Sequence, residues 1–145
     1  MIVPEQRRNL RWILIVGIVV FIAYAPSINN GFISDDYVIL ELVQTWQRDW
    51  RLFAIPSEGI RLTSYAAFAL LHAAVGYRPG LFYLFAILLH FLNVLLLRGL
   101  LQRLSGNEGL AWTAALLFGV LQNPQEAVWW LAGMSDTLVG TFILC

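Results

Sequence analysis

The sequence contains no lysine, one cysteine and few charged side chains of either sign. Charged residues make up 12% of the 145 residues, and nine basic residues balance nine acidic ones. The single Cys145 excludes an intramolecular disulfide and a cysteine-cluster metal site. Because the chain has no net positive charge, we expect no nucleic-acid partner. The sequence also lacks a glycine-rich phosphate loop, a paired-histidine zinc motif, a Ser-His-Asp order and an internal repeat.

Apolar residues, in contrast, make up 59% of the chain and aromatic residues 14%, which is more than one small soluble core can bury. Uncharged runs cover residues 12–34, 79–97 and 109–125, close to the roughly 20 residues that cross a bilayer. We therefore expect an all-α fold, a multi-pass transmembrane helical bundle with spans at about 12–28, 79–103, 109–123 and 136–145. The last run is cut at Cys145 without a charge or turn signal, so we expect the chain to be the N-terminal part of a longer protein.

The loop between the first two spans, residues 29–78, carries a helical pattern of its own. Ile39, Val43 and Trp46 recur at helical spacing. A second uncharged run lies between Arg61 and Arg78 and is short for a span. We expect two amphipathic juxtamembrane helices in this loop, at about 37–50 and 62–76.

Arginine side chains indicate the orientation of the spans. Arg7, Arg8 and Arg11 precede the first span, and Arg98 and Arg103 lie between the second and third. Positive residues favour the cytoplasmic side, so we expect an uncleaved first span and a cytoplasmic N-terminus. We expect the cell (inner) membrane rather than the endoplasmic reticulum. On this topology most acidic residues lie on the outer side: Asp35, Asp36, Glu41, Asp49, Glu58, Glu126 and Asp136.

Two acidic groups on that outer side are candidates for a functional site. The stretch "GFISDDYVIL" (31–40) carries the adjacent Asp35 and Asp36. One carboxylate can cap the start of a helix, whereas a second one beside it adds repulsion and suggests a further role. Glu126 and Asp136 flank an aromatic turn in "NPQEAVWWLAGMSDTLVGTF" (123–142). Each of these acids can also be only a helix-start residue.

The order of these parts resembles the N-terminal region of the GT-C superfamily of glycosyltransferases, which take sugars from polyprenyl-phosphate carriers. The likeness is greatest to the O-mannosyltransferase-like branch that often carries tetratricopeptide repeats. The pattern "EAV-x-W-x-x-G-x-x-D" of that branch is matched by Glu126, Ala127, Val128, Trp130, Gly133 and Asp136. The "LLH" at 88–90 and the Arg-Leu-Thr at 61–63 are similar too, whereas Met134 stands where the family commonly has arginine.

The resemblance implies an enzyme that moves a sugar from a polyprenyl phosphate to a protein or glycan acceptor at the outer membrane face. It implies that Asp36 or Asp35 acts as catalytic base or metal ligand and that Asp136 completes the site. Arg61 and Arg78 would bind the phosphate, because guanidinium suits phosphate geometry, and Glu126 would bind substrate. Asp36 and Asp136 could hold a divalent ion such as Mg²⁺ or Mn²⁺. Whether the acid of the Asp35–Asp36 pair acts as a base or as a metal ligand stays open.

The alternative function is a non-catalytic polytopic membrane protein or a transporter fragment. Functional carboxylates of transporters tend to lie near the bilayer midplane, whereas the acids here lie outside the expected spans, which favours the transferase. We expect membrane lipid as a further partner. We also expect residues 1–145 alone to be inactive, because further spans would be needed to enclose the carrier lipid. His90 and Asn93, three residues apart in the second span, are expected to form interhelical hydrogen bonds.

Overall fold

The computed structural model describes residues 4–49, 51 and 62–145, except for the side chains of 4–6 and 122–125. Within this part of the chain every regular element is a helix and none is a strand, which confirms the all-α prediction. The elements in chain order are α1 (Pro4–Tyr24), the 3₁₀ helix η1 (Ala25–Asn29), α2 (Asp35–Arg48), α3 (Leu62–Val75), α4 (Pro79–Ser105), α5 (Glu108–Val120), α6 (Gln122–Trp129), the 3₁₀ helix η3 (Leu131–Gly133) and α7 (Met134–Leu144).

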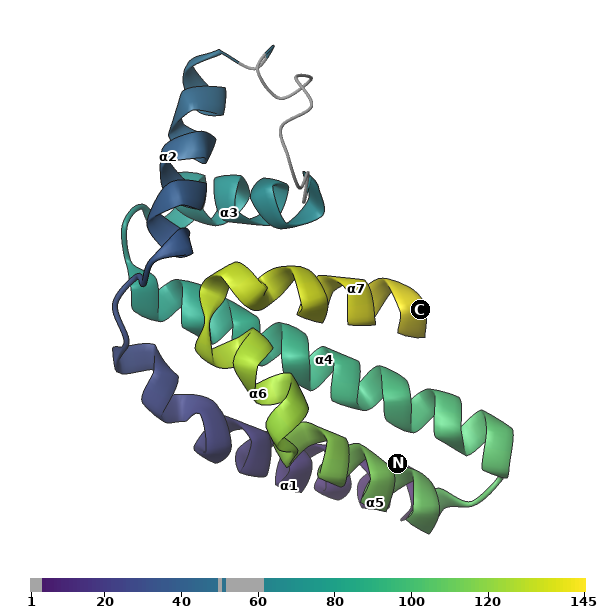
Figure 1. The fold of residues 1–145 in the computed structure, drawn as a ribbon. Coiled ribbons are helices and arrows are strands. Elements are labelled where there is room, and N and C mark those ends of the chain that lie inside the picture. Colours follow the sequence, from purple (N-terminus) through teal and green to yellow (C-terminus); the bar gives the residue numbers. More distant parts are fainter. Residues whose placement is uncertain (1–3, 50, 52–61) are drawn as a thin grey trace.

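Helix α4 is the longest element, and α1, α5 and α7 pack along it (Figure 1). The contact between α1, α4 and α5 is close at Gly119. A Cβ atom added there would lie 2.9 Å from Cγ2 of Val20 and 3.3 Å from Cγ2 of Val94. Since real Cβ atoms do not approach other atoms as closely as 2.9 Å, the spacing of these three helices depends on glycine at this position.

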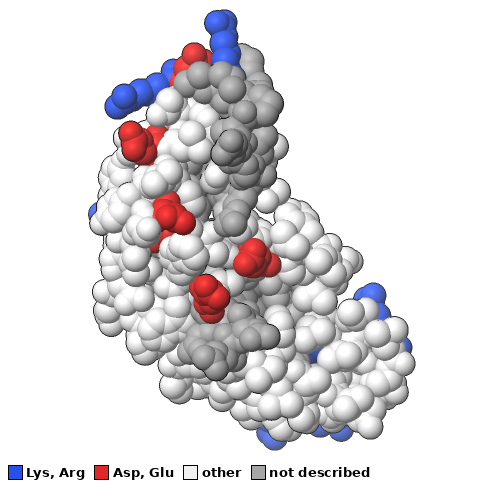
Figure 2. Space-filling model, in the orientation of Figure 1, with Lys and Arg blue, Asp and Glu red and all other residues white. Residues whose placement is uncertain are grey.

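A tight turn joins α4 to α5 at one end of the bundle. Gly106 ends α4 in the left-handed region (φ 65°), and the Asn107 side chain accepts a hydrogen bond from the Leu110 N–H at 3.1 Å. Arg8 of α1 forms an ion pair with Glu108 at this turn. In Figure 2 basic side chains lie at this lower end and also at the top of the molecule, whereas the acidic side chains in view lie in the central and upper parts. The N-terminal arginines and the α4–α5 turn therefore share one end.

Among the described residues, two helical segments are long and apolar enough to cross a membrane: Arg7–Asn29, which joins α1 to η1, and Pro79–Ser105. The span expected at 109–123 is shorter in the structure. Helix α5 has 13 residues and ends at Val120 because Leu121 is extended (φ −66°, ψ 152°). At about 1.5 Å per residue, α5 covers about 20 Å of the roughly 30 Å hydrocarbon core.

Helices α2 and α3 pack against each other beyond the N-terminal end of α4, and α3 runs crosswise to α2 (Figure 1). They lie close to the expected ranges 37–50 and 62–76. Trp46 of α2 packs on Tyr65 of α3 with ring centroids 5.2 Å apart, and Phe68 of α3 packs on Phe82 of α4 at 5.5 Å. These aromatic contacts join the C-terminal end of α2 to α3 and join α3 to α4, so they hold the two short helices against the rest of the molecule.

Candidate functional site: an acidic pocket

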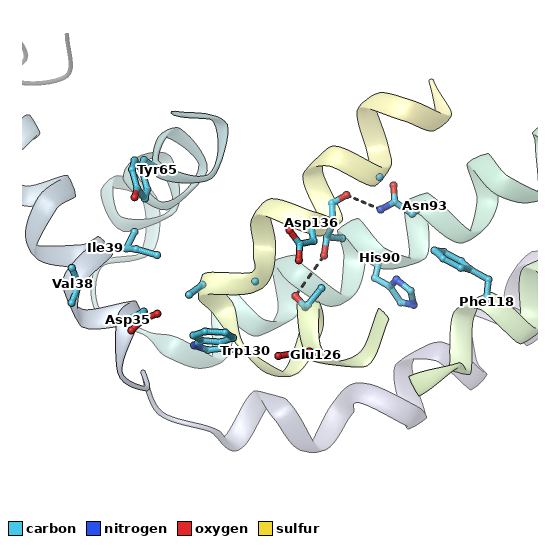
Figure 3. Close-up of a pocket in the computed structure, with 15 residues that line it drawn as sticks. Asp35, Val38, Ile39, Tyr65, His90, Asn93, Phe118, Glu126, Trp130 and Asp136 are labelled. Atoms are coloured by element: carbon cyan, nitrogen blue, oxygen red, sulfur yellow. Dashed lines mark hydrogen bonds between the residues drawn. The ribbon is translucent and has the colours of Figure 1, made fainter. Parts of the chain in front are cut away.

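A pocket of about 590 Å³ opens where α2, α3, α4, α5, α6 and α7 meet (Figure 3). Its volume falls within the range of about 300–1,000 Å³ that is usual for small-ligand sites. Three carboxylates from distant parts of the chain line it: Asp35, Glu126 and Asp136. We call this the acidic pocket. The structure thus brings three of the predicted site residues to one cavity.

Asp35 lies in the first turn of α2 and is exposed. The Ser34 hydroxyl donates a hydrogen bond to its Oδ1 at 3.1 Å. Ser34 itself has φ 46°, a backbone conformation that non-glycine residues rarely adopt. Such strain is often found at functional sites. It accompanies a sharp turn of the chain just before the acidic pair.

Asp36, the neighbour of Asp35, is fully buried and does not line the pocket. Its Oδ2 accepts a hydrogen bond from the Ile33 N–H at 2.9 Å, and its Oδ1 accepts one from the Ala132 N–H at 2.8 Å. Burial raises the pKa of Asp36 above its ordinary value; the two backbone donors oppose this rise, and the charge of Asp35 adds to it. Asp36 therefore connects the start of α2 to η3, which is a positioning role.

The Glu-to-Asp motif folds into α6, η3 and the start of α7. Gly133 lies where this chain reverses, and a Cβ atom there would come 3.1 Å from Cα of Ala127. The tight turn places Glu126 and Asp136, both exposed, on the same pocket. Trp130 lies between Asp35 and Glu126 in Figure 3 and forms an aromatic part of the wall.

His90 and Asn93 of α4 line the other end of the pocket together with Phe118 of α5 (Figure 3). His90 Nε2 lies 3.2 Å from the Gly119 carbonyl oxygen. Asn93 bonds to α7: its Nδ2 donates to the Thr137 carbonyl at 2.8 Å, and its Oδ1 accepts from the Thr141 hydroxyl at 2.7 Å. The expectation of interhelical hydrogen bonds is confirmed.

The sequence reasoning did not assign His90, Asn93 or Phe118 to the site. The signal was present, because His90 and Asn93 are polar and share one face of a strongly apolar helix. Polar residues within such a helix often mark a functional site. What the sequence could not show is that the same face borders a cavity shared with the acidic residues of α2, α6 and α7.

Arg78, one of the two arginines predicted to bind phosphate, does not line this pocket. Arg78 is exposed and lines a separate, shallow groove with Ile28, Tyr77 and Leu84. Arg61 lies outside the described residues. The described lining of the acidic pocket carries three carboxylates and no arginine.

The carboxylate oxygens of the pocket are of the kind that Mg²⁺ and Mn²⁺ prefer. However, the described residues contain no group of three or more His, Cys, Asp or Glu side chains close enough to hold a metal ion. Asp36, one of the two expected ligands, has a backbone donor on each of its oxygens. A divalent-ion site at Asp36 and Asp136 stays a prediction, and the roles proposed for the pocket carboxylates do not depend on a metal.

The chain matches no protein-family model, no curated protein and no solved structure in the comparisons made with known proteins. The functional argument therefore depends on the geometry and chemistry of the acidic pocket.

Proposed function

We propose that the protein is a membrane glycosyltransferase of the GT-C type, which moves a sugar from a polyprenyl-phosphate carrier to an acceptor at the non-cytoplasmic face. The observation that carries this proposal is the convergence of Asp35, Glu126 and Asp136 on one pocket of ligand size. An acceptor-rich cavity suits a sugar, because a sugar presents many hydroxyl donors. Paired acids also suit the activation of a hydroxyl nucleophile.

The proposed topology is a multi-pass bundle in which α1 and α4 cross the membrane and α5 and α7 belong to further spans. The end that carries the N-terminal arginines and the α4–α5 turn would face the cytoplasm, since positive residues favour that side. The start of α2 lies at the opposite end of α4 (Figure 1). The acidic mouth of the pocket would then face the outer membrane surface, where a lipid-linked sugar could enter.

In the proposed reaction, the Asp35 carboxylate acts as the general base. It takes the proton from the acceptor hydroxyl, whose oxygen bonds to the anomeric carbon of the sugar as the bond from that carbon to the phosphate oxygen breaks. The polyprenyl phosphate leaves with the bonding electrons. Asp136 and Glu126 accept hydrogen bonds from sugar hydroxyls, and Asp36 positions Asp35. Arg78 and Arg61 are the proposed partners of the phosphate.

The test is sugar transfer by the full-length protein in nanodiscs, with radiolabelled polyprenyl-phosphate mannose as donor and a Ser/Thr-rich peptide as acceptor. Asp35→Asn should reduce transfer by about 10²–10⁴-fold, as expected for loss of a general base. Glu41→Gln is the matched control, because Glu41 is an exposed acid of the same helix and does not line the pocket. Equal transfer by wild type and Asp35→Asn would refute the assignment of the base.

A chelator arm separates the two roles open to the carboxylates. If transfer by wild type is unchanged in excess EDTA, Asp35 acts as a base without a metal. If EDTA abolishes transfer and Mn²⁺ restores it, the carboxylates hold a metal ion that assembles with the substrate. If wild type transfers no sugar from any polyprenyl-phosphate donor, and Asp136→Asn has the same donor affinity as wild type, the alternative of a non-catalytic membrane protein is favoured.

A further inference from the structure

One ring nitrogen of His90 has no partner among the described residues. The side chain is 1% exposed and lines the acidic pocket. Nε2 is held at 3.2 Å by the carbonyl of Gly119, which lies in the last turn of α5, where carbonyl groups lack helical donors. A carbonyl only accepts, so Nε2 carries the proton. In the neutral imidazole Nδ1 then has a free lone pair.

Aromatic rings hold this imidazole in place. Tyr24 of α1 packs against it edge-on with ring centroids 5.2 Å apart, and Phe118 of α5 packs at 5.4 Å. Because the ring is fixed by these contacts and by Gly119, Nδ1 is the one His90 atom left for a hydrogen bond with a ligand. Since His90 lines the cavity, this free lone pair can accept a hydrogen bond from a donor that the cavity receives.

The remaining chemistry of the pocket restricts that donor. Figure 3 shows His90 and Phe118 at one end, Asp35 and Trp130 at the other, and Asp136 between them. The charged side chains of the described lining are carboxylates, which accept hydrogen bonds. An ionised phosphate offers only acceptors and would be repelled here. A neutral polyol offers a donor to each of these groups.

We infer that the end of the pocket at His90 is the specificity subsite for the transferred sugar, in which Nδ1 of His90 accepts a hydrogen bond from one ring hydroxyl. Asn93, held by Thr137 and Thr141, forms the adjacent wall. This inference rests on the proposed function and deepens it. It makes His90 the residue that distinguishes a sugar with this hydroxyl from its deoxy analogue, because the deoxy sugar leaves a buried acceptor unpaired.

Two substitutions separate the two ring nitrogens. In His90→Gln the longer side chain can place its amide near the position of Nε2 and keep the bond to Gly119, but it has no acceptor at the position of Nδ1. In His90→Asn the shorter side chain can place an acceptor near Nδ1 but cannot reach Gly119. The first variant tests the ligand contact, and the second is its matched control for the loss of the imidazole.

The experiment measures binding of short-chain polyprenyl-phosphate mannose, its four mono-deoxy analogues and sugar-free polyprenyl phosphate to the full-length protein in nanodiscs. Wild type should bind one deoxy analogue about 10- to 100-fold more weakly than the parent sugar. His90→Gln should lose this discrimination and keep the affinity for sugar-free polyprenyl phosphate. His90→Asn should keep the discrimination and show a lower melting temperature.

The outcomes separate the inference from the proposed function. If wild type binds the donor but treats all deoxy analogues alike, or if His90→Gln keeps the wild-type profile, the subsite is refuted and the transferase proposal stands. If wild type binds none of the polyprenyl phosphates, both proposals fail.

A spectroscopic readout applies even if both variants fail to fold. In wild-type protein labelled with ¹⁵N-histidine, the unprotonated Nδ1 resonance of His90 should shift when polyprenyl-phosphate mannose is added, and the deoxy analogue should not reproduce the shift. His72 provides the internal control, because it does not line the acidic pocket. An unchanged His90 resonance under saturating donor would overturn the inference.

Discussion

Replacing Asp36 by Asn should destabilise the protein much more than the same change at Asp35. The two oxygens of Asp36 each accept a backbone hydrogen bond, a part-buried one from Ile33 and a buried one from Ala132. A carboxamide has one oxygen, so Asp36→Asn leaves one of these N–H groups without an acceptor. Such an unsatisfied buried donor costs about 1–3 kcal/mol. Asp36→Ala removes both acceptors and should cost about twice as much.

Two effects reduce this loss. The amide carries no charge, so it avoids the desolvation that raises the pKa of Asp36 in the folded protein, and it removes the repulsion with Asp35. We therefore expect a net loss of about 1–2 kcal/mol for Asp36→Asn. Asp35 is exposed and accepts from the Ser34 hydroxyl, which an amide oxygen can still do. Asp35→Asn should change the stability by no more than about 0.5 kcal/mol.

The assay is thermal unfolding in detergent, followed by intrinsic tryptophan fluorescence. At about 2–4 °C per kcal/mol, Asp36→Asn should lower the melting temperature by about 2–8 °C, and Asp35→Asn by less than about 2 °C. Size-exclusion profiles show whether each variant is monodisperse before heating. Equal shifts for the two variants, or a larger one for Asp35→Asn, would contradict the placement of Asp36 as the connection between α2 and η3.

Three further measurements test other parts of the structure. Folding raises the pKa of Asp36, so the folded state binds more protons than the unfolded state between about pH 3.9 and the raised pKa. The stability of wild type relative to Asp36→Asn should therefore fall as pH rises through this window, and a rise would refute the burial of Asp36 as the cause of its raised pKa. Gly119→Ala should lower the stability by about 1–3 kcal/mol, because the new Cβ meets Val20 at 2.9 Å. The control Gly99→Ala, with no atom within 4 Å of its Cβ, should be neutral or stabilising by up to about 1 kcal/mol. Similar melting temperatures for the two variants would be inconsistent with the tight α1–α5 contact. Asn93→Leu should weaken the packing of α7 on α4 by about 0.5–2 kcal/mol, measured as faster proteolysis of α7, and unchanged proteolysis would argue against that hydrogen-bonded connection.

Much of the fold follows from local sequence patterns. The apolar run at 79–97 predicts α4 because a long uncharged stretch forms a helix without help from distant residues, and Gly106 ends that helix through its own backbone freedom. The stripe of Ile39, Val43 and Trp46 predicts the buried face of α2 for the same reason. The acidic residues of the site were also recognisable, since paired carboxylates beside apolar helices are uncommon.

The boundaries of α5 were less predictable. The uncharged run at 109–125 suggests one continuous span, but Leu121 is extended and the chain begins a new helix at Gln122. Such a break is set by how α5 and α6 each pack on α4. An uncharged run looks the same in the sequence whether it forms one helix or two. Composition alone cannot locate it.

The sequence by itself predicted that the protein is helical and that its acids gather outside the long apolar runs. It also predicted four spans, whereas two of the described helical segments are long and apolar enough to cross a membrane. Only the tertiary structure decided that Asp35 lines a pocket while Asp36 is buried. The two residues are chemically identical neighbours, and they differ because the Ala132 N–H, 96 positions away, pairs with one of them. A contact of that range depends on the packing of all the helices between the two residues, and no local pattern encodes it.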